Sequence, residues 1–289
     1  MDSYPFPRYK PFMSSKIKID LPFMKMHGLG NDFVVVDARN QSFPAVNSVI
    51  KRIADRNRGV GFDQLAVIEQ SDMDGHLIFY NSDGSTSLTC GNATRCIARY
   101  LMDESGKTEL TLTTNHGIIK ACDVGEGYTS VNMGQPQTQW HDIPLAENID
   151  TLHLPIPGDP VATGMGNPHC TFFVEDAENV DLKTRAAPIE KHPLFPESAN
   201  VQFASLVGKN RIRMRVWERG VGETLASGSS SCATAVAAIR RGLSGHKVLI
   251  DLDGGQLSVD WEKEGVWLTG PTMHVFTGNF SPEFLESLK

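Results

Sequence analysis

Residues 90–104, CGNATRCIARYLMDE, and residues 227–243, SGSSSCATAVAAIRRGL, are two apolar segments that each begin with a small polar residue followed by glycine. Their apolar residues recur at helical spacing, and a glycine follows the basic last turn of the second segment. We therefore predict two apolar helices, one from Asn92 and one from Ser230. The matched beginnings suggest that the chain contains an internal duplication.

Polar landmarks repeat in the same order along the two parts of the chain. Counterparts 136 or 137 positions apart are Gly30-Asn31 and Gly166-Asn167, Gln64 and Asn200, Asn81-x-x-Gly84 and Glu218-x-Gly220, and Cys90-Gly91 and Ser227-Gly228. A pseudo-twofold arrangement would bring such pairs to one interface, where ligand sites are common. We predict a first half at 24–135, a second half at 136–276, an extension at 1–23, and a tail at 277–289 that packs back on the first half.

Short apolar or alternating runs, separated by Gly, Asn, Asp and Pro, indicate strands. They lie at 33–37, 64–69, 76–80, 109–114, 128–133, 170–175, 211–217, 247–252 and 265–270. Many strands and few helices predict an α+β fold. The length of 289 residues favours two domains.

The composition excludes several classes of protein. Hydrophobic residues make up 40% and charged residues 21%, as in ordinary globular proteins. No apolar run is long enough to cross a bilayer, and net charge −7 without a Lys/Arg block argues against nucleic acid or membrane partners. Residues 1–23 lack the apolar centre of a secretory signal, so we expect a cytoplasmic protein. Five cysteines without a C-x-x-C pair or zinc-ligand spacing predict neither a disulfide framework nor a metal site.

The beginnings of the two predicted helices contain the groups that we expect to bind an anion and to transfer protons. The first turn of a helix leaves backbone N–H groups unpaired at the positive end of the helix dipole, and such an end binds anions. Two of them facing one cleft would hold a carboxylate from both sides and make its α-proton more acidic. A helix start also lowers the pKa of a thiol, so Cys90 is a candidate general base. Ser227 occupies the matching position with a hydroxyl, a much weaker acid.

Seven motifs between Met24 and Phe276 occur in the order typical of one family. They are KMHGLGNDFVVVD at 25–37, GVGFDQLAVIE at 59–69, FYNSDGS at 79–85, CGNATRCIA at 90–98, GNPHCTFFV at 166–174, PESANVQF at 196–203 and WERGVGETLASGSSSC at 217–232. On these residues the sequence resembles the diaminopimelate epimerases, which are pyridoxal-independent isomerases of lysine and peptidoglycan biosynthesis.

The resemblance implies two pseudo-symmetric α/β halves, each a curved sheet or open barrel around a central apolar helix, with the active site between them. It implies epimerisation of LL-diaminopimelate to meso-diaminopimelate by two-base proton transfer, without a cofactor. The implied catalytic residues are Cys90, Ser227, His169 and Glu218. The implied substrate-binding residues are Asn31, Gln64, Asn81, Gly91, Asn92, Asn167, Asn200, Glu218, Arg219, Gly228 and Ser229. A homodimer is also implied, although Phe276 stands where the family often has a Tyr at a dimer contact.

Position 227 departs from the family pattern, which has its second catalytic Cys there. We therefore expect substrate binding to be retained and turnover to be impaired. Two alternatives stay open: a related amino-acid racemase or dehydratase that uses Cys90 alone, and a non-catalytic amino-acid-binding protein. Product analysis and deuterium uptake at the α-carbon would separate them.

Overall fold

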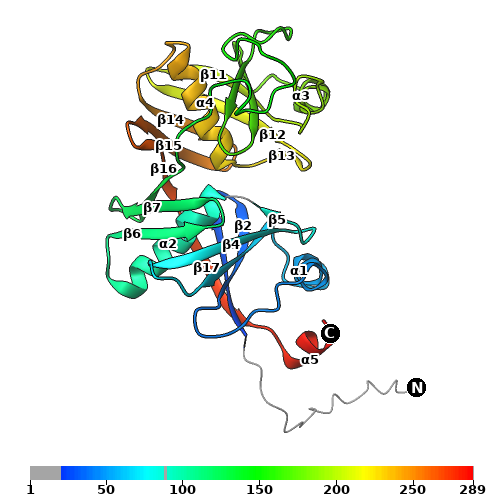
Figure 1. Ribbon diagram of the computed structural model, residues 1–289, viewed down its shortest axis with the longest axis vertical. Helices are drawn as coiled ribbons and strands as arrows, with labels where there is room; N and C mark the ends of the chain where they lie inside the picture. Colours follow the sequence, from blue (N-terminus) through cyan, green and yellow to red (C-terminus); the bar gives the residue numbers. More distant parts are fainter. Residues whose placement is uncertain (1–20, 88–89, 289) are drawn as a thin grey trace, which may run out of the picture.

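The computed structural model describes residues 21–87 and 90–288, so most of the expected N-terminal extension lies outside the described part. Two lobes are stacked along the long axis of the molecule (Figure 1). Each is built of strands around one central helix, α2 (Gly91–Ser105) in the first lobe and α4 (Gly228–Arg240) in the second. In the described ranges, no helix combines the length and the apolar character needed to span a membrane.

The expected α+β fold and its two similar halves are confirmed, and every predicted strand and helix is present. The first lobe contains β1 (Pro22–Gly28), β2 (Asn31–Asp37), α1 (Asn47–Ala54), β3 (Gln64–Glu69), β4 (Gly75–Asn81), β5 (Thr86–Ser87), β6 (Glu109–Thr114), β7 (Gly117–Asp123) and β8 (Tyr128–Asn132). The second contains β9 (Val161–Gly164), β10 (Pro168–Phe173), α3 (Leu182–Glu190), β11 (Asn200–Gly208), β12 (Arg211–Glu218), β13 (Gly222–Thr224), β14 (Lys247–Leu252) and β15 (Gly255–Glu262). β16 (Gly265–Pro271) runs between the lobes, and β17 (Met273–Asn279) and α5 (Pro282–Ser287) return to the first.

The duplication is visible in the strand pairing. β2 pairs with β3 in parallel, with Phe33 opposite Gln64, and β10 pairs with β11 in parallel, with His169 opposite Asn200. The next strands, β4 and β12, run antiparallel to β3 and β11 and parallel to β6 and β14. The landmarks related by the sequence offset therefore occupy equivalent places in the two lobes.

The lobes are joined by main-chain pairing. β16 follows β15 in the second lobe and pairs antiparallel with β8 of the first, with Leu268 opposite Val131. β17 then pairs antiparallel with β1. After it, Phe280 and Leu285 pack in an apolar cluster of the first lobe with Phe23. The end of the chain thus holds the lobes in a fixed relation.

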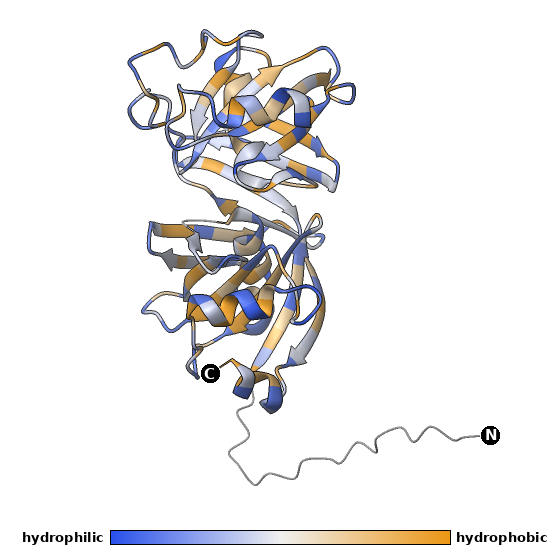
Figure 2. Ribbon diagram, turned by 90° about the vertical axis from the view of Figure 1, so that its right-hand side faces the viewer, coloured by the Kyte–Doolittle hydropathy of each residue, from blue (hydrophilic) through white to orange (hydrophobic). Residues whose placement is uncertain are grey.

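The central helices form the core because most residues of each are buried among the surrounding strands. Their buried residues share one cluster with the inner faces of the surrounding strands. Figure 2 shows orange, apolar residues along the strands of both lobes and bluer residues in the connecting loops. Cys90 caps the start of α2, where its sulfur accepts a hydrogen bond from the Ala93 N–H, and Gly106, in the left-handed conformation (φ 72°), caps its end.

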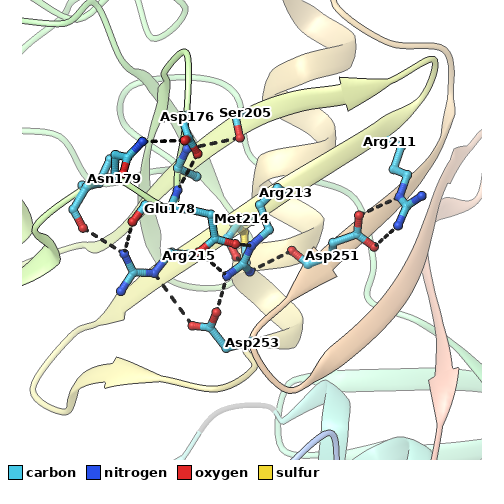
Figure 3. A network of polar contacts seen from close by, with 12 residues as sticks. Asp176, Glu178, Asn179, Ser205, Arg211, Arg213, Met214, Arg215, Asp251 and Asp253 are labelled. Carbon is cyan, nitrogen blue, oxygen red and sulfur yellow. Dashed lines mark hydrogen bonds and ion pairs between the residues drawn. The ribbon is translucent and has the colours of Figure 1, made fainter.

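An ion-pair network covers the outer face of β12 (Figure 3), where arginines alternate with buried apolar residues. Arg213 pairs with Glu178 at 2.6 Å and also with Asp253, and Arg211 pairs with Asp251 at 2.6 Å. Because Asp251 and Asp253 belong to the β14–β15 hairpin, the network fixes this hairpin on β12.

The tip of the β14–β15 hairpin touches both lobes. The Gly254 N–H donates to the Leu225 carbonyl at 2.8 Å, just before α4. A Cβ on Gly254 would lie 2.1 Å from the Leu29 carbonyl oxygen in the β1–β2 turn, so only glycine fits. The hairpin therefore holds the two loops that flank the beginnings of the central helices.

Candidate functional site

A cleft with a volume of about 310 Å³ lies between the lobes. Its lining includes all but one of the residues predicted from the sequence: Asn31, Gln64, Asn81, Cys90, Gly91, Asn92, Asn167, Asn200, Glu218, Arg219, Ser227, Gly228 and Ser229. The exception, His169, is fully buried behind Asn167. Within residues 21–87 and 90–288, no three His, Cys, Asp or Glu side chains are grouped as a metal site.

The two helix beginnings meet at one side chain, Leu268 of β16. A Cβ on Gly91 would lie 3.1 Å from Leu268 Cδ2, and a Cβ on Gly228 would lie 2.9 Å from the same atom. Both glycines have a φ that any residue adopts, so their role is close packing rather than backbone freedom. A Cβ on Gly228 would also lie 3.3 Å from Asn92 Oδ1. The two tips therefore bring Cys90 and Ser227 to one cleft.

Cys90 is a protonated thiol at neutral pH in this structure. Burial raises the pKa of its thiol to about 12, while the hydrogen bond from the Ala93 N–H and the charge of Arg95 act in the opposite direction. The sequence predicted a lowered pKa at this helix start. The structure corrects that expectation, because the loss of hydration around the thiolate outweighs the favourable field of the helix.

Ser227 lies beside a buried carboxylate. Its hydroxyl donates to Glu218 Oε2 at 2.8 Å, and the Thr224 hydroxyl donates to Glu218 Oε1 at 2.7 Å. Burial raises the pKa of Glu218, and the two hydroxyl donors partly offset this effect. The side chain at position 227 is therefore in direct hydrogen-bond contact with an acceptor for its proton.

Amide side chains of the first lobe form two hydrogen-bonded groups along the cleft. Asn92 Nδ2 donates to Asn31 Oδ1 at 3.1 Å, and Asn31 Nδ2 donates to Asp63 Oδ2 at 2.9 Å. Gln64 Nε2 donates to Asn81 Oδ1 at 3.0 Å, across the β3–β4 pair. These bonds fix which end of each amide faces the cleft.

In the second lobe, Asn200 and the loop after β12 hold each other. Asn200 Oδ1 accepts from the Arg219 N–H at 3.0 Å, and its Nδ2 donates to the Pro168 carbonyl at 3.1 Å. Arg219 Nη1 donates to the Glu197 carbonyl at 2.8 Å. Arg219 also lines the cleft.

His169 contacts the cleft only through its neighbour. Its Nε2 lies 2.7 Å from Asn167 Oδ1, and its Nδ1 lies 3.0 Å from Gln202 Nε2. Burial, together with the charge of Arg219, lowers the pKa of His169 to about 3. The ring is therefore neutral, with both nitrogens engaged.

Six further lining residues were not singled out from the sequence: Asp63, Ser82, Ser87, Met133, Val221 and Thr224. Asp63 directly precedes Gln64 and Thr224 lies within the motif at 217–232, so the motifs contained the signal. Asp63 and Thr224 contribute to the site through hydrogen bonds with Asn31 and Glu218, respectively, and motif spacing alone does not reveal these bonds. Gln202, behind the cleft, was missed for the same reason.

Comparison with known proteins identifies the family of the chain. The family model for diaminopimelate epimerase matches residues 23–139 and 161–277. The chain is 47% identical to a diaminopimelate epimerase of Rhodospirillum centenum, over 91% of this chain and 93% of that protein. It is also 47% identical to one of Acidiphilium cryptum, over 91% of this chain and 98% of that protein.

A solved structure of low sequence similarity has the same fold. The phenazine biosynthesis protein of the PhzF family from Bacillus anthracis superposes with a TM-score of 0.65 at 15% identity, covering 90% of this chain and 99% of that one. The family model covers both lobes and the relatives cover nearly the whole chain. The chain therefore belongs to the diaminopimelate epimerase family and is an amino-acid isomerase.

Proposed function

We propose that the chain binds LL- and meso-diaminopimelate in the cleft, that positions 90 and 227 are its two acid/base positions, and that Ser227 restricts it to the half-reaction of Cys90. The observation that carries the proposal is that Cys90 and Ser227, at the tips of two related helices, line one cavity. No cofactor is needed for this chemistry.

The helix tips are suited to hold the carboxylate of the reacting centre. Gly91, Asn92, Gly228 and Ser229 present the first N–H groups of α2 and α4, which have no partners within their helices. Both helix dipoles point their positive ends at this place, so negative charge that develops at the α-carbon during proton removal is stabilised.

Inversion at the α-carbon needs two groups on opposite faces. A base removes the α-proton and leaves the bonding electron pair on a planar carbanion, and an acid on the other face then supplies a proton to that pair. In one direction the Cys90 thiol gives its proton to the carbanion; in the reverse direction the Cys90 thiolate, which is the minor form at neutral pH, takes the α-proton. With Ser227 as the partner, the second transfer requires an alkoxide or proceeds slowly through Glu218.

The other end of the substrate carries an ammonium group and a carboxylate. Arg219 offers N–H donors for the carboxylate, and Asn81, Asn167 and Asn200 offer amide groups. Asp63 and Glu218 are the carboxylates in the described lining and favour binding of ammonium groups. We infer from this set that the cleft accepts a substrate with an amino-acid group at each end.

Exchange of the α-hydrogen tests the proposal. Each isomer of diaminopimelate is incubated with the protein in D₂O and followed by proton NMR. We expect exchange with at most one isomer and little conversion to the other, and we expect Cys90→Ala to lose the exchange. Rapid exchange of both isomers with full conversion would contradict the impaired role of Ser227. A keto or imine product would instead indicate a dehydratase.

Three further expectations from the sequence, on domain division, oligomeric state and location, remain proposals. The division at 135/136 is supported by the equivalent strand pairings on its two sides. A homodimer is supported by Met273, Val275 and Phe276 on β17, whose side chains are about half exposed; sedimentation of Phe276→Asp tests it. A cytoplasmic location rests on the sequence alone.

A further inference from the structure

Gln202 is a buried polar residue behind the cleft whose hydrogen bonds are all satisfied. The Thr171 hydroxyl donates to its Oε1 at 3.1 Å, and its Nε2 donates to Ser230 Oγ at 3.0 Å. The second hydrogen of Nε2 faces His169 Nδ1, at 3.0 Å. The amide therefore has Oε1 toward Thr171 and Nε2 toward Ser230 and His169; the two hydroxyls can each donate or accept, so the protonation of His169 Nδ1 is the feature that goes with this orientation.

Strand geometry brings these groups together. Thr171 of β10 is in register with Gln202 of β11, and His169 is in register with Asn200. Successive side chains of β11 alternate between faces, so Asn200 and Gln202 share the face toward α4, which carries Ser230. Val201 and Phe203 pack instead in the outer apolar cluster of the second lobe. The pairing of β10 with β11 therefore positions the hydrogen-bonded polar side chains next to one another.

The orientation of Gln202 favours one tautomer of His169, whose Nδ1 also lies 3.5 Å from Ser230 Oγ. Because Nδ1 accepts a hydrogen bond from Gln202, the proton of the neutral ring lies on Nε2. Nε2–H then donates to Asn167 Oδ1 at 2.7 Å. Burial disfavours the imidazolium form of the ring, and the charge of Arg219 acts in the same direction. With Oδ1 of Asn167 engaged, the amide offers its Nδ2 hydrogens to the cleft that it lines.

We propose that Gln202 is a positioning residue that sets the His169 tautomer and, through it, turns Asn167 so that an N–H donor faces a carboxylate of the substrate. The assignment of the carboxylate rests on the proposed function. The relay from Gln202 to Asn167 rests on the hydrogen bonds alone. Gln202 touches no substrate and acts only through the ring.

Nitrogen NMR of the protein labelled with ¹⁵N-histidine tests the relay directly. The His169 signals are identified by their absence in His169→Gln. We expect the native chain to show a neutral ring protonated on Nε2 throughout pH 5–8. We expect Gln202→Glu, whose carboxylate accepts a hydrogen bond, to move the proton to Nδ1 or to produce imidazolium. A native ring protonated on Nδ1 would overturn the proposal without any variant.

Calorimetric binding of meso-diaminopimelate supplies the second readout. Because one oriented hydrogen bond is lost, we expect Gln202→Leu and Gln202→Glu to weaken binding about tenfold. Ser205→Ala is the matched control: Ser205 is buried on the same strand and accepts from the Ala177 N–H, so its loss should leave tautomer and affinity unchanged. Equal weakening by Ser205→Ala would overturn the proposal, since it would indicate general loosening of β11.

The two readouts separate this inference from the proposed function. If the tautomer changes as expected while the native chain binds no diaminopimelate, the proposed function fails and the relay is supported. If Gln202→Leu and Gln202→Glu both retain the Nε2–H tautomer, the relay is refuted whatever the affinity. If neither variant folds, Thr171→Val, which removes the donor to Oε1, is expected to yield a mixture of tautomers, and an unchanged ring would count against the proposal.

Discussion

Ser227→Cys is expected to raise epimerisation by about 10²–10⁴-fold in kcat/KM, because it restores one positioned proton-transfer group beside an unchanged Cys90. That factor corresponds to about 3–5 kcal/mol of the activation barrier. The proposed function leaves only position 227 without such a group, so only one such factor is expected. Both the helix tips and the amide network around the cleft are already in place.

The contacts of position 227 indicate that the thiol fits and functions. Ser227 is 3% exposed, and its hydroxyl lies 2.8 Å from Glu218 Oε2. A thiol there would have a proton acceptor at contact distance, in a carboxylate whose pKa is raised by burial toward the working range. Replacing the hydroxyl hydrogen bond by a weaker thiol one costs about 1 kcal/mol of stability, which the fold tolerates.

The assay follows conversion of LL- to meso-diaminopimelate by chiral chromatography, with deuterium incorporation in D₂O as a second signal. Ser231→Cys is the matched control, because it adds a buried thiol on α4 at a position whose hydroxyl bonds the Ser227 carbonyl instead of Glu218. Cys90→Ala in the Ser227→Cys background should abolish the gain. Equal activity of the native chain and the Ser227→Cys variant, both folded and both binding substrate, would refute the role given to position 227.

Two predictions concern stability. Burial acts to raise the pKa of Asp32, but its contacts with Arg56 and a lysine outweigh burial and lower this pKa to about 2, so the carboxylate should contribute about 2 kcal/mol at neutral pH. Because the folded pKa is depressed, this contribution is present above about pH 4 and lost as the pH falls toward 2. Urea unfolding of Asp32→Asn across this range should show the difference from the native chain shrinking; a constant difference would exclude the ion pair as its source. Gly228→Ala should destabilise by about 1–3 kcal/mol, because the added methyl lies 2.9 Å from Leu268 Cδ2. Gly208→Ala, whose Cβ would be 3.7 Å from its nearest neighbour, should change the melting temperature little, and equal effects would reject the packing argument.

The local pattern of apolar and polar residues was sufficient to predict the strongly periodic helices and strands. The strand at 211–217 is predictable because buried apolar residues alternate with arginines, and both central helices were predicted within two residues of their starts. β11 was missed although Asn200 and Gln202 alternate with Val201 and Phe203; its face toward α4 is polar, so its burial depends on tertiary contacts. α3 was missed because it is short and contains Pro188.

The sequence by itself determined the duplication and the two helix starts, because these are properties of local order and of spacing along the chain, and its resemblance to a family implied most of the residues that line the cleft. The tertiary structure alone decided how they act. Glu218 meets Ser227, and Asp63 orients Asn31, only through folding. The pKa of Cys90 also lies above its ordinary value rather than below it, because burial depends on every element packed around the sulfur. Hydration and hydrogen-bond partners are set by neighbours in space, and one-dimensional spacing does not specify them.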